Sequence, residues 1–309
     1  MIKFSVRKVS WLLLAVAVAI GMWSCNKDDG HMEGVYPIIF NCKTLGSKAV
    51  VNSADALQND VNGFMAYAYY EINSNSLSFD KNVTYDASLG WKYDGVQYWL
   101  PGANYWFKAF YPKPEGYVLT VDNAVRKQSY TISNYDITTQ KDLLVASAEA
   151  SVATGEDAPI TGSVVKFTFD HILACVSIKL KSELTGVTVN NVSLSSIAKI
   201  GTCNDGVWSY NGTTDINKNS EITLEVNAQD FADVTAGGFL VIPNRVDGSQ
   251  EVKIETSYKT YTATIPEITW LSGKKYTYTM VIKQDNIIFN EPTVVEWDEE
   301  NATGSVIIK

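Results

Sequence analysis

Apolar and polar residues alternate with a period of two along most of the chain after residue 35, and no other feature constrains the fold as strongly. A period of two puts every second side chain on the same face of an extended strand, so it predicts half-buried β-strands. Asn-Gly and Asp-Gly pairs separate these segments and suit tight turns, because both positions tolerate positive φ. The clearest alternating segments are 164–169, 176–181, 187–189, 222–226, 252–254 and 276–282, and the turn pairs are at 62–63, 94–95, 205–206, 211–212 and 247–248.

The alternation predicts an all-β chain, because no segment after residue 25 shows the pattern of an amphipathic helix of three turns. Many short strands at this spacing are typical of antiparallel β-sandwiches. With 309 residues, of which 46 % are hydrophobic, the chain is long enough for two such domains at about 150 residues each. The polar, turn-rich stretch 148–162 predicts an N-terminal β-sandwich over 36–155 and a C-terminal one over 156–309.

The first 24 residues have the pattern of a signal peptide. Lys3, Arg7 and Lys8 form a positive start, and residues 11–20 form an apolar run. Ten apolar residues are too few to span a bilayer, which needs roughly 20. Cys25 follows a small residue, as in bacterial lipoprotein signals, so we expect Cys25 to be lipidated and residues 25–35 to form a linker. The alternative is an ordinary secretory signal with a cysteine nearby by chance.

The residues after Cys25 resemble the lipoprotein export signal of Bacteroidetes, in which a lysine and two acids direct the protein to the outer cell surface. Here these residues are Lys27, Asp28 and Asp29. The resemblance implies a surface-exposed lipoprotein of the outer membrane, and several acyl chains on one cysteine make such an anchor stable. The alternative interpretation of this short charged run is a solvated linker.

Charge and the supply of reactive side chains exclude several function classes. The 34 acidic and 25 basic residues give a net charge of −9, which argues against a nucleic-acid partner. Only two histidines occur, and no phosphate loop, nucleophile elbow or zinc-protease motif is present. We therefore expect no enzyme, no metal site and no cofactor. His171 is expected to be structural, since it and its neighbour Asp170 point to opposite faces of a strand.

The three cysteines after Cys25 cannot all pair within one chain. The sequence favours buried free thiols at Cys42, Cys175 and Cys203, although pairing of Cys175 with Cys203 stays open.

An ordered set of motifs resembles the fimbrillin-like family of Bacteroidales lipoproteins, the type V pilins, over about residues 36–309. The motifs are the aromatic strands around 63–72, 98–101 and 106–112, then 142–146, 165–174, 270–278 and 295–297. The resemblance implies two transthyretin-like β-sandwich domains. It also implies a subunit of a cell-surface fimbria, structural or accessory, that serves adhesion. In this family a trypsin-like protease removes the first strand, and a strand from a neighbouring subunit takes its place.

Residues 35–42 are the expected removable strand, because the apolar run 38–40 would pair with a sheet early in the chain. Its removal would expose backbone groups and a hydrophobic groove that another strand could fill. The family usually carries an arginine soon after this strand, whereas this chain has Lys48 there. Lys48, or else Lys43, is therefore the candidate processing site for a lysine-tolerant protease. The alternative is that the first strand stays in place.

The donor strand is expected within residues 287–309. The candidates are the segment 287–289 and the apolar triplet Val306, Ile307 and Ile308 near the end of the sequence. Alternatively, the triplet is the last strand of its own domain. The expected partners are other fimbrial subunits, the outer membrane through the lipid anchor, and a host or glycan ligand.

A non-polymerising, glycan-binding surface lipoprotein is the second function that the sequence allows. A cluster of aromatic residues could stack against sugars, but aromatic side chains on alternating strands more often pack in the core. The cluster comprises Trp91, Tyr93, Tyr98, Trp99, Tyr105, Trp106 and Phe107.

Overall fold

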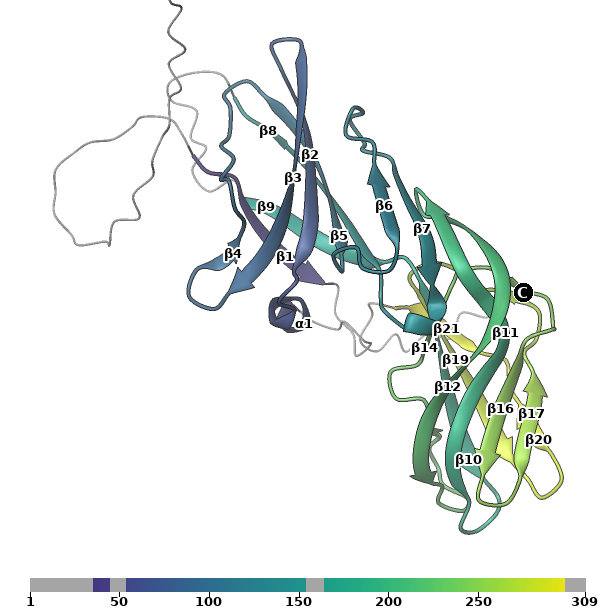
Figure 1. Cartoon of the computed structure of the whole chain (residues 1–309). Coiled ribbons are helices and arrows are strands. Elements are labelled where there is room, and N and C mark those ends of the chain that lie inside the picture. The colour runs from purple at the N-terminus through teal and green to yellow at the C-terminus, as the bar shows by residue number, and fades with distance from the viewer. Residues whose placement is uncertain (1–35, 45–53, 154–163, 298–309) are drawn as a thin grey trace, which may run out of the picture. The chain divides into compact units, whose positions relative to one another are not determined.

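The computed structural model describes residues 36–44, 54–153 and 164–297, and almost all of its regular structure is β-strand (Figure 1). Within these residues the helices are the short α1 (Ala54–Asn59) and one turn of 3₁₀-helix, η1 (Ile137–Thr139). No described helix has the length and apolar character needed to span a membrane. The prediction of an all-β chain is confirmed.

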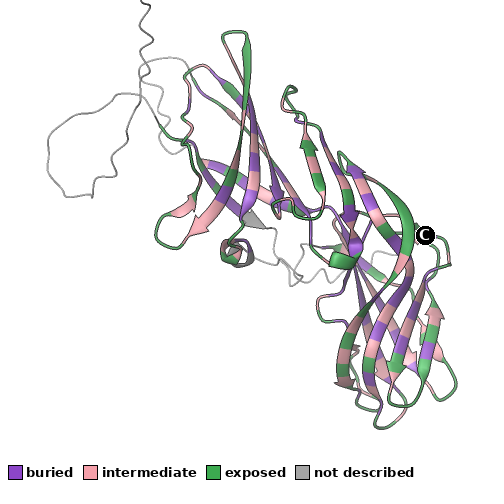
Figure 2. Cartoon of the chain, viewed as in Figure 1, coloured by how far each residue is buried: buried purple, intermediate pink, exposed green. Residues whose placement is uncertain are grey.

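Burial follows the predicted alternation along the strands, as the alternating colours in Figure 2 show. In β9 (Val164–His171) the side chains of Val165, Phe167 and Phe169 are buried and their neighbours are more exposed. In β19 (Lys274–Ile282) every second residue from Tyr276 is buried. The turn at Asp205–Gly206 has positive φ at both residues, as an Asp-Gly hairpin requires.

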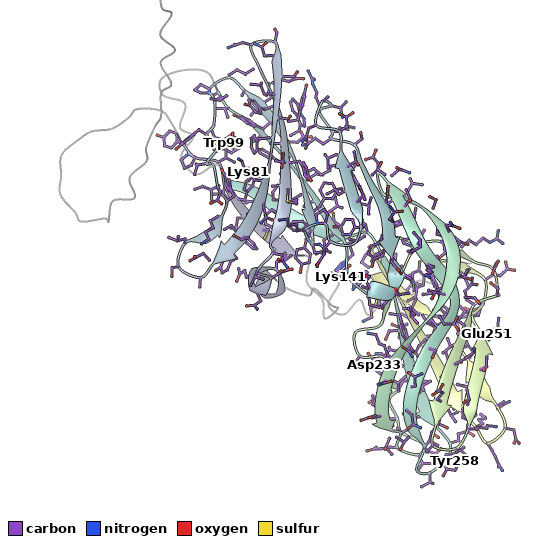
Figure 3. All side chains as sticks on the ribbon, in the orientation of Figure 1. Lys81, Trp99, Lys141, Asp233, Glu251 and Tyr258 are labelled. Atoms are coloured by element: carbon purple, nitrogen blue, oxygen red, sulfur yellow. The ribbon has the colours of Figure 1, made fainter. Side chains whose placement is uncertain are left out.

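One seven-stranded sheet contains most of the strands in the first half of the chain, in the order β1-β9-β8-β5-β2-β3-β4. Its buried face holds an aromatic cluster that includes Phe64, Phe107, Phe167 and Trp99, the last labelled in Figure 3. The strands not yet given are β1 (Ile39–Thr44), β2 (Phe64–Ile72), β3 (Asn75–Asp86), β4 (Gly90–Lys92), β5 (Asn104–Tyr111) and β8 (Leu144–Ser151).

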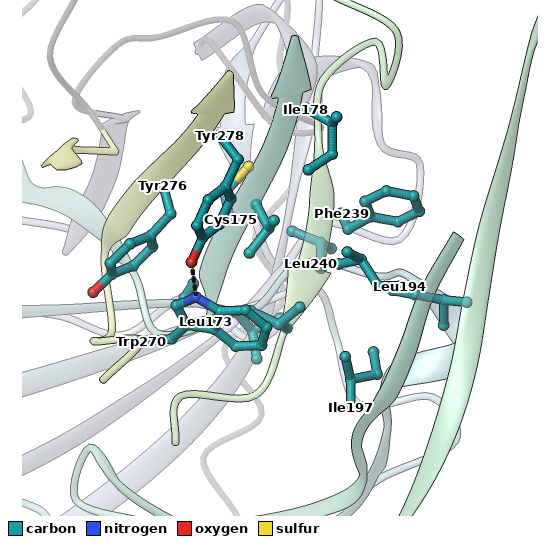
Figure 4. Packing of buried hydrophobic residues seen from close by; sticks show 14 of the residues in the cluster. Leu173, Cys175, Ile178, Leu194, Ile197, Phe239, Leu240, Trp270, Tyr276 and Tyr278 are labelled. Atoms are coloured by element: carbon teal, nitrogen blue, oxygen red, sulfur yellow. Dashed lines mark hydrogen bonds between the residues drawn. The ribbon is translucent and has the colours of Figure 1, made fainter. Parts of the chain in front are cut away.

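Two further sheets of six strands share a second buried core. One has the order β13-β10-β19-β20, with β14 paired to β10 and β21 to β19, and the other has β17-β16-β11-β7-β6, with β12 paired to β11. Figure 4 shows Leu194 and Ile197 of β11 on the side of the core that faces the sheet of β10, β14 and β19. In the same core the Trp270 indole donates to the Tyr278 hydroxyl at 3.1 Å. A two-stranded sheet pairs β15 with β18. The remaining bounds are β6 (Val118–Val121), β7 (Tyr130–Asp136), β10 (Ala174–Ser182), β11 (Thr188–Asn204), β12 (Val207–Thr223), β13 (Ala232–Asp233), β14 (Phe239–Val241), β15 (Arg245–Val246), β16 (Glu251–Thr256), β17 (Thr260–Thr264), β18 (Ile268–Thr269), β20 (Ile287–Phe289) and β21 (Thr293–Glu296).

The sheets differ from the sequence-based expectation in two respects. They do not divide at residues 155 and 156, because β9 joins the seven-stranded sheet while β6 and β7 join the sheet of β11. They are also not purely antiparallel, because β1 runs parallel to β9 and β10 runs parallel to β19. Alternation shows which face of a strand is buried, but it carries no information about the strand's direction or its partner.

Candidate functional site

The predicted removable strand is an edge strand of the seven-stranded sheet. β1 pairs in parallel with β9 from Ile39 opposite Val164 to Thr44 opposite Phe169. Just upstream, the Ile38 N–H donates to the Gln97 carbonyl at 2.8 Å, and the Trp99 N–H donates to the Tyr36 carbonyl at 2.9 Å. The prediction that the apolar run 38–40 pairs with a sheet is confirmed.

β9 depends on β1 for most of its pairing. β8, the neighbour of β9 on its other side, pairs with β9 only at Leu144 opposite His171 and Val145 opposite Asp170. Beyond these pairs a cavity of about 410 Å³ lies between residues 147–150 of β8 and 164–166 of β9. Among the described strands, β1 alone pairs with Val164–Phe169. Loss of β1 would therefore leave the backbone groups of that part of β9 without a strand partner.

The inward face of the first strand fills a hydrophobic groove. Ile38, Phe40 and Cys42 are 1 %, 2 % and 6 % exposed, whereas Ile39 between them is 47 % exposed. Burying a large apolar side chain contributes about 1.5–3 kcal/mol, so Ile38 and Phe40 add to the backbone bonds that hold the strand.

Phe40 makes the most specific contacts in this groove. Its ring stacks on the ring of Phe167 with centroids 5.7 Å apart, meets the edge of Phe107 at 6.1 Å, and lies tilted against Tyr93 at 5.3 Å. The Tyr93 hydroxyl donates to the Ile38 carbonyl at 2.7 Å. Burial raises the pKa of Tyr93, so its hydroxyl remains a donor at neutral pH.

Most of the predicted site residues lie outside the described residues. These are the lipidation residue Cys25, the export residues Lys27, Asp28 and Asp29, the processing residue Lys48, and the donor triplet Val306, Ile307 and Ile308. Lys43 lies in β1, near the end of the strand at Thr44. Of the two candidate donors, the segment 287–289 is described, and as β20 it pairs antiparallel with β19.

A buried polar cluster lies around Trp297, the residue that follows β21. The ring of Trp297 is 1 % exposed and stacks on the His171 imidazole with centroids 3.9 Å apart. Nδ1 of His171 lies 2.8 Å from a carboxylate oxygen of Asp142, and both side chains are almost fully buried. This buried position between Asp142 and Trp297 fits the prediction of a structural histidine. Sequence reasoning missed Asp142 and Trp297 as partners, and no local signal links residues so far apart in the chain.

The aromatic cluster considered as a sugar platform belongs mainly to the core. Trp99, Tyr105 and Phe107 are at most 2 % exposed, and Trp91 and Tyr93 pack against the same core. Of the seven aromatic residues, Tyr98 is exposed, at 40 %, and the other six are buried or half-buried. The core interpretation of this cluster is confirmed.

The three described cysteines are free and buried, as expected. Burial raises the pKa of the Cys42 and Cys175 thiols from 9.0 to about 12, and that of Cys203 to about 11. These thiols are therefore protonated at neutral pH and are poor nucleophiles.

No group of three or more potential metal ligands occurs among the described residues. A cavity of about 520 Å³ lies beside η1, and two pairs of its polar lining residues contact each other. The Tyr111 hydroxyl donates to Asp60 at 2.8 Å, and Lys141, labelled in Figure 3, lies 2.9 Å from Glu115.

Comparison with known proteins gives one family and several similar folds. The fimbrillin-like family model matches residues 49–297. A fimbrial protein from Bacteroides vulgatus has a TM-score of 0.57 at 17 % identity, covering 85 % of this chain and 100 % of that one. A candidate cell adhesion protein from Bacteroides ovatus has a TM-score of 0.56 at 13 % identity, covering 87 % of this chain and 100 % of that one. One from Bacteroides uniformis has a TM-score of 0.50 at 18 % identity, covering 84 % of this chain and 98 % of that one. No curated protein matches by sequence.

Proposed function

The chain belongs to the fimbrillin-like family, and from this we propose that it is a structural or accessory subunit of a cell-surface fimbria, a type V pilus that serves adhesion. The solved structures whose fold it shares are a fimbrial protein and candidate cell adhesion proteins. In this proposal the two buried cores belong to two transthyretin-like domains, and the partners are other fimbrial subunits and a host or glycan ligand.

The observation that supports assembly by strand exchange is the position of β1. It is an edge strand whose inward side chains fill a hydrophobic groove, and it provides most of the pairing of β9. A protease that cuts after Lys48 would separate residues 35–42 from the rest of the chain. Another strand can then restore both the backbone pairing and the apolar contacts, as in other cases of β-strand addition.

The remaining residue roles concern the route to the surface. Cys25 carries the lipid, and Lys27, Asp28 and Asp29 direct export to the outer face of the outer membrane. After assembly, residues 287–309 supply the donor strand. Val306, Ile307 and Ile308 are its sequence-based candidate.

Limited proteolysis followed by strand uptake tests this function. A lipid-free chain that starts at Asn26 is treated briefly with trypsin and its new N-terminus is sequenced. We expect cleavage after Lys48 that is lost in Lys48→Gln and retained in Lys43→Gln. The cut chain is then incubated with a fluorescent peptide of residues 36–44 and run on a native gel. Uptake of the peptide supports strand exchange, and a cut chain that keeps its own strand and takes up none contradicts it.

No observation in the described residues favours the glycan-binding alternative. A sugar platform needs exposed aromatic faces, and only Tyr98 of the predicted cluster is classed as exposed.

A further inference from the structure

We propose that the groove under β1 takes a strand from a different protein, and that residues 287–309 of a second copy of this chain do not fill it. The strand that fits carries a large aromatic residue at the position of Phe40 and an aliphatic residue two positions before it. This inference rests on the proposed function, since the groove opens only when β1 is removed. It adds which kind of protein supplies the strand and which side chains that strand carries.

The groove requires an aromatic ring because three aromatic side chains form its central part. Phe40 contacts the rings of Phe107, Phe167 and Tyr93. Phe107 and Phe167 also contact other buried rings of this core, including Trp99 and Phe64, so they cannot move in to fill a space. A valine or isoleucine at this position would leave a cavity, and its cost grows with its volume.

The last twelve residues of the sequence supply no such ring. Residues 298–309 read Asp-Glu-Glu-Asn-Ala-Thr-Gly-Ser-Val-Ile-Ile-Lys and contain no aromatic residue. If Val306 takes the position of Phe40, then Gly304 takes that of Ile38. If Ile308 takes the position of Phe40, then Val306 takes that of Ile38. In either register the aromatic site receives a smaller, branched side chain.

One other segment of the chain does match the first strand. Ile287-Ile288-Phe289-Asn290 repeats the sequence Ile38-Ile39-Phe40-Asn41. This segment is already part of its own sheet, because β20 pairs with β19 and the Phe289 ring lies 5.3 Å from that of Tyr278. The match also ends at Glu291, which would place a carboxylate where Cys42 is buried.

Freeing β20 would also disrupt the chain that follows it. Only residues 290–292 separate β20 from β21, so β20 cannot reach a neighbouring molecule while β21 stays paired with β19. Detaching β21 would withdraw Trp297 from His171 and break the bond from the Trp297 N–H to the Gly273 carbonyl at 2.7 Å. Within residues 287–309, a second copy therefore offers either a tail without an aromatic residue or a strand that is already paired in its own sheet.

Peptide uptake by the cut chain tests the inference. Four labelled peptides are compared: residues 36–44, the same peptide with Phe40→Ile, residues 301–309, and the last with Ile308→Phe, which keeps Val306 at the position of Ile38. The peptide with Ile39→Val serves as a control, because Ile39 is largely exposed. We expect the Phe40→Ile and 301–309 peptides to bind at least about tenfold more weakly than the 36–44 peptide, with Ile308→Phe recovering most of the loss. Equal affinity of the 301–309 peptide, or an SDS-resistant ladder from the cut chain alone, would overturn the inference.

A second measurement uses the intact chain and needs no strand exchange. The double variant Ile38→Val, Phe40→Ile places the tail sequence Val-Ile-Ile in the groove. We expect its Tm to fall by about 5 °C, and Ile39→Val to leave the Tm unchanged. An unchanged Tm in the double variant would overturn the aromatic requirement. If the cut chain takes up no peptide at all, including residues 36–44, strand exchange itself fails, and the Tm still decides whether the groove requires an aromatic residue.

Discussion

The buried pair of Asp142 and His171 shows how a single side chain supports the segment that follows β21. One carboxylate oxygen of Asp142 accepts from the Leu143 N–H at 2.8 Å, and the other lies 2.8 Å from His171 Nδ1. The imidazole in turn forms the surface on which Trp297 stacks. The pair therefore connects the end of the seven-stranded sheet with the segment that leads to the C-terminal residues.

Replacing this acid should destabilise the protein. Asp142→Ala removes the carboxylate beside a buried imidazole nitrogen, which costs about 2 kcal/mol and lowers the Tm by about 4–8 °C. Glu115→Ala is the matched control, because Glu115 also pairs with a basic side chain but is 77 % exposed. Its effect should stay within about 0.5 kcal/mol. Equal Tm values for the two variants in thermal denaturation would contradict this role of Asp142.

Stability should fall at high pH because of the buried phenols and thiols. Burial raises the pKa values of Tyr111, Tyr117, Tyr130, Tyr135 and Tyr278 above 10.0, and those of the three cysteines above 9.0. Each group is neutral in the folded state and ionises more easily when unfolded. Its contribution is therefore complete below the unfolded pKa and is lost as the pH rises toward the folded pKa.

We expect a constant Tm between pH 7 and about pH 9 and a steady decline above that. Exposed tyrosines such as Tyr210 and Tyr258 ionise first, in the folded protein. The remaining increase in tyrosinate absorbance should coincide with the loss of near-ultraviolet circular dichroism, because the buried phenols ionise only as the protein unfolds. Reversible ionisation of these tyrosines near pH 10 with the circular dichroism unchanged would contradict the prediction.

At the scale of elements, the hairpin of β2 and β3 depends on a glycine at its base. Gly63 has φ +65°, and a Cβ added there would lie 1.9 Å from the carbonyl oxygen of Val83 in β3. Gly90 has a similar φ of +77° but has no atom within 4 Å of an added Cβ. The two positions thus share the cost of a side chain at positive φ and differ in the space available.

Gly63→Ala should therefore destabilise the protein far more than Gly90→Ala. Positive φ alone costs about 1–2 kcal/mol, and at Gly63 the backbone of β3 must also move, which disturbs the pair of Phe64 and Val83 at the start of β2. Urea denaturation of the two variants measures the difference. If both lose the same free energy of unfolding, the contact with β3 is not limiting.

The strands themselves could be predicted from the sequence, but their partners could not. The alternation around Phe167 and Tyr278 correctly gave strands with those side chains inside. It could not show that β1 runs parallel to β9, because both directions bury the same face. It could also not separate Trp99 from Tyr98 as core and surface, since that depends on pairing of this segment with residues 36–38.

At the scale of the whole molecule, the hairpin of β6 and β7 links the two cores. Tyr130, Ile132 and Tyr135 of β7 are buried in the second core. From the turn that joins the two strands, the Arg126 guanidinium donates twice to the Glu71 carboxylate of β2, at 3.0 and 2.7 Å, and lies over the Trp106 ring of β5. The hairpin thus belongs to one core through its strands and contacts the other sheet through its turn.

Fragments cut at residue 155 should therefore fold poorly. A fragment of residues 36–155 lacks β9, which pairs with β1 and β8, and lacks β11, which pairs with β7. We expect it to show no cooperative thermal transition. A fragment of residues 36–171 with residues 113–140 replaced by a short Gly/Ser loop keeps all seven strands of the first sheet and should melt cooperatively. A cooperative transition in the first fragment but not in the second would contradict this topology.

The parallel pairing of β1 with β9 has a mechanical consequence. The register joins six residues of one strand to six of the other along their length. A pull along the axis of β1 therefore loads these backbone bonds in shear, all at once, whereas a pull across the sheet would open them one after another. Resistance to such a pull is set by the rate of rupture and not by the equilibrium free energy of pairing. A partner strand that occupies the same register would give the joint between two subunits of a fibre the same resistance to a pull along that strand.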